Sequence, residues 1–199
     1  DIRLANMKAG NYLDFPPGSP GAEEWLESRR RNNRIPSGPD VFRPAAEARG
    51  TALKAMCAQY GFEGLFPLDQ SVPEAITEPA AQAEWIYAAN IALIRRADAV
   101  LANMDFFRGA EPDSGTCFEV GYAVALGKPV YGYIPEDGSF AQRIRQRYPQ
   151  TIGADGRVDT HGWNFEEFGL PLNLMLAVPA PLIVGSVRDA LARIAADNP

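Results

Sequence analysis

Cysteine and histidine are scarce in this sequence. Its 199 residues include two cysteines, Cys57 and Cys117, and one histidine, His161. The cysteines lie in apolar helical patterns and form no metal-type pair, and a zinc site or a Ser-His-Asp triad would have to be built around His161 alone. We therefore expect no metal and no cofactor. The sparse use of cysteine predicts a reduced, cytoplasmic compartment.

The sequence also lacks an excess of positive charge and long apolar runs. Its formal net charge is −6, which argues against a protein that follows the phosphates of a nucleic acid. No run of about eighteen apolar residues occurs, so no membrane-spanning helix is expected. The first residues also lack the apolar stretch of a secretory signal. With 46% hydrophobic residues, the chain is expected to form a single domain with one core.

Short apolar runs alternate with helical patterns along most of the chain. The strongest strand pattern covers 99–104, a nearly continuous apolar run that is typical of a buried parallel strand. The expected strands cover 65–68, 99–104, 129–133 and 182–185. The expected helices cover 45–60, 79–97, 115–126 and 187–196, and the stretch from 134 to about 166 is expected to be irregular. This alternation predicts an α/β fold with a doubly wound parallel sheet.

A polar loop and a helix start follow the strand pattern at 99–104. Ligands of open parallel sheets bind beyond the carboxyl ends of the strands, so the chemistry is expected here. The segment reads Phe107-Arg108-Gly109-Ala110-Glu111-Pro112-Asp113-Ser114-Gly115-Thr116-Cys117-Phe118-Glu119. Glu119 is expected in the first helical turn, where the helix dipole favours an ionised carboxylate. Such a carboxylate can attack an anomeric carbon and form a covalent sugar ester, while Asp113 protonates the departing base or orders the pocket.

The same residues also allow a structural interpretation. Thr116-x-x-Glu119 is a capping box, in which the glutamate bonds back to the helix start. Asp113-Ser114-Gly115 is equally a plain turn, and Gly115-Thr116 at a helix start can bind an anion. Residue types alone therefore lead only to an α/β protein with an acidic site.

Several stretches, in the right order, resemble the nucleoside 2-deoxyribosyltransferase family. They are Gly38–Phe42, Asn90-Ile91 with Ala97–Asn103, Phe107–Ala123 and Gly169–Leu176. The resemblance covers roughly residues 38–196. It implies a flavodoxin-like fold and an enzyme that cleaves the N-glycosidic bond of 2′-deoxynucleosides. The 2-deoxyribosyl group would pass to another nucleobase with retention of configuration.

The resemblance also implies roles for individual residues. Glu119 would be the nucleophile, and Asp113 would assist the departure of the base. Asn173 would reach the active site of a neighbouring subunit and hold the sugar hydroxyls, and Asn90 would contact the base. The other substrate-binding candidates are Asp40, Phe42, Phe107, Arg108, Gly115 and Tyr122. The aromatic residues among them would stack on the base or belong to the core. The implied partners are deoxynucleosides and free nucleobases, in a homodimer or larger homo-oligomer with shared active sites.

The front of the chain departs from the family pattern. An apolar strand usually leads into Gly-Pro, but here the residues are Arg34-Ile35-Pro36-Ser37, and a proline removes a donor from a central strand. Either Ile2–Asn6 supplies the first strand and 8–36 is an insertion, or the front is rebuilt. We therefore divide the chain into an atypical segment, 1–37, and a catalytic domain, 38–199.

Two alternatives to the transferase remain open from the sequence. A hydrolase of nucleosides or nucleoside 5′-monophosphates would use the same covalent intermediate with water as acceptor, whereas a dry pocket would favour transfer. A non-catalytic nucleotide-binding sensor would account for the unusual front, but it does not need a nucleophilic carboxylate.

Overall fold

A parallel sheet organises the part of the chain that the structure, a computed structural model, describes: residues 2–7, 46–154 and 156–198. Five strands of these residues pair in the order β2-β1-β3-β4-β5, and every neighbouring pair is parallel. They are β1 (Ile2–Met7), β2 (Phe62–Leu65), β3 (Ala99–Asn103), β4 (Val130–Ile134) and β5 (Leu182–Val184). This is the flavodoxin-like order, which confirms the predicted fold class.

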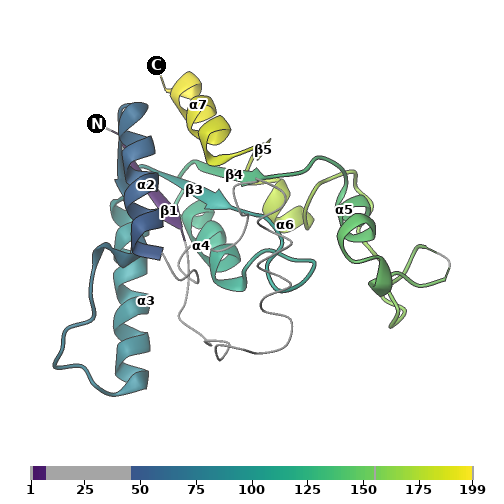
Figure 1. Ribbon diagram of the computed structural model, residues 1–199, viewed down its shortest axis with the longest axis horizontal. Coiled ribbons are helices and arrows are strands. Elements are labelled where there is room, and N and C mark those ends of the chain that lie inside the picture. The colour runs from purple at the N-terminus through teal and green to yellow at the C-terminus, as the bar shows by residue number, and fades with distance from the viewer. Residues whose placement is uncertain (1, 8–45, 155, 199) are drawn as a thin grey trace.

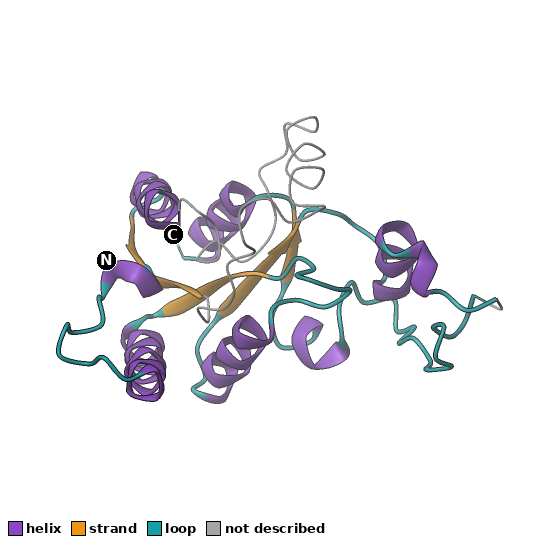
Figure 2. Ribbon diagram, turned by 60° about the horizontal axis from the view of Figure 1, so that its bottom comes forward, coloured by secondary structure: helices purple, strands orange, loops and turns teal. Residues whose placement is uncertain are grey.

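Helices cover both faces of the sheet (Figure 2). On one face lie α2 (Ala46–Gln59) and α7 (Val187–Asp197), and on the other lie α3 (Pro79–Arg96) and α4 (Ser114–Ala125). The neighbours Val100 and Leu101 of β3 are both 0% exposed and belong to the cores on opposite faces. Successive side chains of a strand point to opposite faces, so burial on both sides explains the continuous apolar run at 99–104.

Strand β1 is an interior strand of the sheet, between β2 and β3. Its register pairs Ile2 with Phe62 and Leu4 with Ala99. Of the two alternatives for the front of the chain, the one in which Ile2–Asn6 supplies the first strand therefore holds. The suggested insertion at 8–36 lies outside the described residues, and the division of the chain at residue 38 stays a prediction.

Two local expectations were wrong. The strand expected at 65–68 occupies Phe62–Leu65 instead, and Pro67, which has no N–H to donate, begins the 3-10 helix Pro67–Asp69. The stretch after β4 is not wholly irregular, since it contains α5 (Phe140–Arg147) and the 3-10 helix Pro149–Thr151. Ser139 and Gln142 form a capping box that starts α5. The short helix α6 (Leu174–Ala177) follows later.

Candidate active site

The carboxyl edge of the sheet is where the fold places a ligand. The strand order reverses between β1 and β3, and in doubly wound sheets such a switch point opens a crevice beyond the strand ends. The loop after β3 and the start of α4 lie at this edge (Figure 1). The structure therefore puts the predicted motif at the expected position in the fold.

The loop between β3 and α4 is closed on itself. The backbone N–H of Phe107 donates to the carbonyl of Glu111 at 2.8 Å. Arg108 has a φ of 53°, in the left-handed region that costs a non-glycine residue energy. Its guanidinium carbon lies 4.6 Å from the centroid of the Phe107 ring. Both substrate-binding candidates lie on the loop that precedes α4, where Phe107 is half-buried and Arg108 is partly exposed.

Asp113 is the N-cap of α4. Its Oδ2 accepts hydrogen bonds from the backbone N–H of Thr116 at 2.9 Å and from the Thr116 hydroxyl at 3.1 Å. The helix begins at Ser114, with Gly115 in its first turn, so Glu119 is its sixth residue and lies in the second turn. The expected place of Glu119 in the first turn was wrong, and so was the capping box with Thr116 as cap. The helix dipole acts mainly within the first turn and contributes little at Glu119.

Glu119 belongs to the buried face of α4. The buried residues of this helix are Thr116, Glu119, Val120 and Ala123. Their spacing is the i, i+3, i+4, i+7 stripe that usually carries apolar side chains toward a core. Glu119 is 3% exposed. Burying a carboxylate is costly, so an ionisable residue within a core stripe marks a candidate functional group.

Asn90 lies on the helix next to α4. It is 9% exposed and shares the buried side of α3 with Leu93 and Ile94. The two helices pack together, with the ring centroids of Tyr87 and Phe118 6.2 Å apart. Asn90 is therefore a buried amide on the helix that flanks the Glu119 helix.

Asn173 is the N-cap of α6, a helix that packs on α4. Its Oδ1 accepts from the backbone N–H of Met175 at 3.0 Å, and its Nδ2 donates to Oε1 of Glu166 at 2.6 Å. The other oxygen of Glu166 accepts from the backbone N–H of Leu174 at 2.9 Å. Sequence reasoning missed Glu166, and a local pattern gives no signal for a side-chain contact across a loop of seven residues.

The remaining substrate-binding candidates are placed differently. Tyr122 lies in the last turn of α4, where its hydroxyl accepts from Nε of Arg95 at 2.7 Å and its ring stacks on Phe118. This contact ties Tyr122 to the last turn of α3, away from the helix start that Asp113 caps. Asp40 and Phe42 lie outside the described residues.

A buried ion network begins at the first part of this loop. Asp105 follows β3, and its carboxylate bonds both Arg143, at 3.1 Å, and Arg147, at 2.8 Å. Arg143 is 0% exposed and also donates to the carbonyl of Pro171 at 2.9 Å. Burial lowers the pKa of Arg143, and the Asp105 carboxylate opposes that shift. The network links the loop that leads to α4 with the segment that leads to Asn173.

The thiol beside Glu119 is held in its neutral form. Burial, and then the carboxylates of Glu111 and Asp113, raise the pKa of Cys117 to about 11. A nucleophilic cysteine needs a lowered pKa, so the raised pKa argues against a nucleophilic role for Cys117. Desolvation, followed by the charge of the Glu166 carboxylate, also raises the pKa of Glu111.

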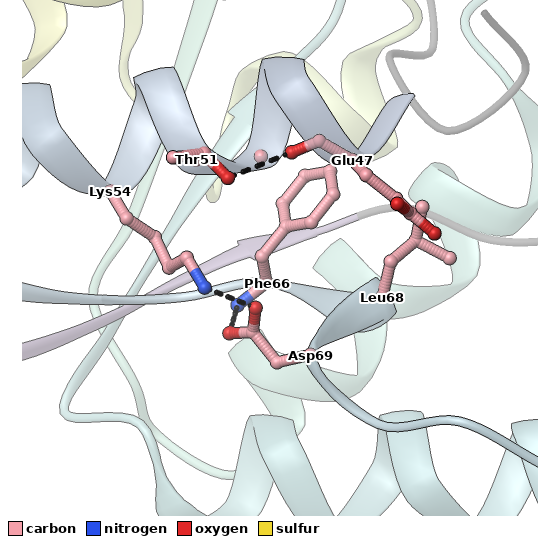
Figure 3. A pocket seen from close by; sticks show the side chains of 7 residues that line it. Glu47, Thr51, Lys54, Phe66, Leu68 and Asp69 are labelled. Atoms are coloured by element: carbon pink, nitrogen blue, oxygen red, sulfur yellow. Dashed lines mark hydrogen bonds and ion pairs between the residues drawn. The ribbon is translucent and has the colours of Figure 1, made fainter. Parts of the chain in front are cut away.

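A separate hollow of about 190 Å³ lies between α2 and the end of β2 (Figure 3). Its lining residues are Glu47, Gly50, Thr51, Lys54, Phe66, Leu68 and Asp69. Two of its three charged residues pair with each other, Lys54 with Asp69, and the other oxygen of Asp69 accepts from the backbone N–H of Phe66 at 3.0 Å. Across the described part of the chain, no group of three or more potential ligands could hold a metal ion. No helix of that part is long and apolar enough to span a membrane.

Fold and site together define a class: an α/β protein with a parallel sheet and a buried glutamate on the helix that follows its central strand. Residues 37–175 match the family model described as nucleoside 2-deoxyribosyltransferase. The chain belongs to this family of enzymes, which act on nucleosides and nucleobases. The predicted family is thus confirmed.

The chain is also similar to individual proteins. A 2-desoxiribosyltransferase from Leishmania mexicana is 30% identical, covers 82% of this chain and 96% of its own, and superposes with a TM-score of 0.61. A 2-deoxyribosyltransferase from Bacillus psychrosaccharolyticus is 20% identical, covers 50% of this chain and 69% of its own, and has a TM-score of 0.40. An uncharacterised protein of Schizosaccharomyces pombe is 33% identical over 117 residues, which are 57% of this chain and 54% of that protein. The chain thus spans about half the length of this curated relative.

Proposed function

We propose that the protein transfers the 2-deoxyribosyl group of a 2′-deoxynucleoside to a second nucleobase, through a covalent ester on Glu119. The observation that carries this proposal is the carboxylate at a core position of α4, 3% exposed, at the carboxyl edge of the sheet. In a site of low dielectric constant, a fixed carboxylate stabilises the positive charge that develops on a sugar as its glycosidic bond breaks. Family membership supports the same chemistry.

The reaction balances in two displacements at the anomeric carbon. First, a Glu119 oxygen bonds to C1′, the C1′–N bond breaks, and its electron pair leaves with the base. Asp113 passes a proton to the departing base. Then a nitrogen of the incoming base attacks C1′ from the face that the first base left, the ester bond to Glu119 breaks, and the N–H proton of the incoming base passes to Asp113. Two inversions give net retention.

The geometry of Asp113 supports this assignment of the proton. Both of its contacts with Thr116 use Oδ2. We therefore assign the transferred proton to Oδ1. The N-cap contacts would hold the carboxyl group in one orientation during both steps.

The primary test compares two glutamine variants in the same assay. The protein is incubated with deoxyinosine, with and without adenine, and products are separated by chromatography. Glu119→Gln keeps the shape of the side chain but removes the nucleophile, so deoxyadenosine formation should fall by several orders of magnitude at an unchanged melting temperature. Glu84→Gln, on the exposed side of α3, is the matched control and should stay within twofold of wild type.

The possible outcomes separate the candidate functions. Deoxyadenosine that forms only with adenine, together with a deoxyribosyl adduct on 114–125 in mass spectra of quenched reactions, supports the proposal. Hypoxanthine release that does not depend on adenine identifies a hydrolase. Loss of the fold in Glu119→Gln without a specific catalytic loss would make the glutamate structural, and the proposal would be wrong.

We further propose a homo-oligomer in which Asn173 acts in the active site of a neighbouring copy. Three apolar side chains on and near α6 are solvent-exposed in the single chain, Met175 at 73%, Val178 at 69% and Phe168 at 68%, and such surface is commonly covered by a partner. Mixing Glu119→Ala subunits with Asn173→Ala subunits should then restore part of the activity, and no recovery would mean that each site is built from one chain.

We also propose a cytoplasmic location, because Cys57 and Cys117 are free thiols.

A further inference from the structure

Glu166 makes an unusual pair of contacts with the start of α6. One carboxylate oxygen receives the side-chain amide of Asn173 at 2.6 Å, and the other receives the backbone N–H of Leu174 at 2.9 Å. The carboxylate is half-buried, and hydrogen bonds to an ionised acceptor are stronger than those to a neutral one. Two strong contacts from one side chain therefore fix the residue that begins α6.

The contacts also decide which way the Asn173 amide faces. Its Oδ1 points to the N–H of Met175, and its Nδ2 points to Glu166. A flipped amide would place its oxygen against the carboxylate and its NH₂ group against an N–H donor, so both contacts would become repulsive. Only one orientation of the amide satisfies both neighbours.

An amide fixed in this way has defined free capacity. The contact with Glu166 uses one of the two N–H bonds of Nδ2. The contact with Met175 uses one of the two lone pairs of Oδ1. One donor on Nδ2 and one acceptor on Oδ1 remain, and the orientation of the amide fixes which side carries each. A sugar hydroxyl both donates and accepts, so this pair matches the hydroxyl groups of a deoxyribosyl substrate.

We propose that Glu166 is a positioning residue that holds the Asn173 amide in the orientation that binds the sugar of the substrate. The inference rests on the proposed function, since it needs Asn173 to contact the sugar. Glu166 acts through Asn173 and does not itself touch the reacting atoms.

Glu166→Gln is the sharpest perturbation, because it keeps the length and shape of the side chain. The glutamine side chain has one oxygen acceptor and one NH₂ group, so it cannot accept from both Asn173 and Leu174. The orientation of the Asn173 amide is then no longer fixed. The neighbouring Glu167→Gln is the matched control. Glu167 pairs with Arg145 at 2.9 Å, and its side chain is 61% exposed.

The kinetic test uses deoxyinosine as donor and adenine as acceptor. We expect Glu166→Gln to raise KM for deoxyinosine by about tenfold or more, with a smaller change in kcat, because the contact holds the sugar before and during reaction. Glu167→Gln should stay within twofold of wild type. In an Asn173→Ala background, Glu166→Gln should cost less than about twofold further, since residues that act through one another are not additive. A KM for Glu166→Gln equal to that of wild type, or a loss that multiplies with Asn173→Ala, would overturn the inference.

A second measurement does not depend on turnover. In hydrogen–deuterium exchange, Glu166→Gln should speed exchange of the Leu174 or Met175 amide, whereas Glu167→Gln should not. Unchanged exchange at both amides would show that Glu166 does not fix this segment.

Failure of the proposed function and failure of the inference about Glu166 give different results. Wild-type protein without transfer activity refutes the proposed function, whereas an active enzyme that tolerates Glu166→Gln refutes only the role of Glu166.

Discussion

Replacing Asp105 with asparagine tests how the carboxyl edge of the sheet is held. The side chains of Asp105 and Arg143 are both 0% exposed, and their contact measures 3.1 Å. Arg143 also donates to the carbonyl of Pro171, and its guanidinium carbon lies 4.3 Å from the centroid of the Phe106 ring. Asparagine keeps the shape of Asp105 but removes the negative charge that compensates the buried guanidinium.

The magnitude follows from how each arginine would respond. Arg147 is 24% exposed and also pairs with Glu136, so it keeps a partner and access to water. Arg143 is enclosed, and burial lowers its pKa even with Asp105 beside it. Removing one partner of a buried pair leaves an uncompensated charge and costs about 3–5 kcal/mol. That is a large part of the roughly 5–15 kcal/mol by which a domain is usually stable.

The assay is urea denaturation at pH 7, followed by circular dichroism, with Asp197→Asn as the matched control. Asp197 pairs with Arg193 at 3.0 Å on α7, but the two side chains are 36% and 60% exposed. An exposed pair of this kind contributes about 0.5 kcal/mol or less. If Asp105→Asn lowers the free energy of unfolding by under about 1 kcal/mol, Arg143 is compensated by other groups and the reasoning from burial is refuted.

Two further predictions concern glycine and cysteine. Gly50→Ala should lower stability by about 1–2 kcal/mol, since its Cβ would lie 2.5 Å from the buried Phe66 ring. Gly121→Ala, with open space around its Cβ, should raise stability by about 0.5–1 kcal/mol. Equal changes in urea midpoint would show that helix propensity alone decides both. Burial raises the pKa of Cys57 from 9.0 to about 11, so the neutral thiol stabilises the fold below pH 9 and this stabilisation is lost as the pH rises through 11. The free energy of unfolding should therefore fall more steeply between pH 9 and 11 in wild type than in Cys57→Ala, and parallel curves would contradict the shift.

The fold was predictable because its signals are local. A strand such as β3, buried on both faces, needs an unbroken apolar run. Val100 and Leu101 show why, since their side chains pack into the cores on opposite faces of the sheet.

The exact start of α4 was harder to predict. Asp113 and Thr116 are both good capping residues, so the sequence allows two registers. The chain takes the earlier one, in which Asp113 satisfies the Thr116 N–H and hydroxyl together and the Cys117 N–H bonds the Asp113 carbonyl at 2.9 Å.

Helix α5 was missed for a different physical reason. Three of its eight residues are arginines, which give the segment the composition of a solvated loop. Yet Arg143 is fully buried among Phe140, Ala141 and Ile144 on the inner face of this helix. A buried arginine is stable only with partners, and its carboxylate partner is 38 residues away in sequence. No pattern within α5 itself contains that information.

The polar residues hidden from pattern analysis also determine how the candidate site is assembled. Arg143 bonds Asp105, two residues before Phe107, and Pro171, two residues before Asn173. It therefore joins the loop that leads to the proposed nucleophile with the segment that carries the proposed sugar-binding amide. Apolar packing resists separation but does not fix direction, whereas hydrogen bonds from a planar guanidinium fix both distance and angle. Arg143 thus helps to fix the position of Asn173 within its own chain, and Glu166 then sets the orientation of the amide that this chain offers to the neighbouring active site.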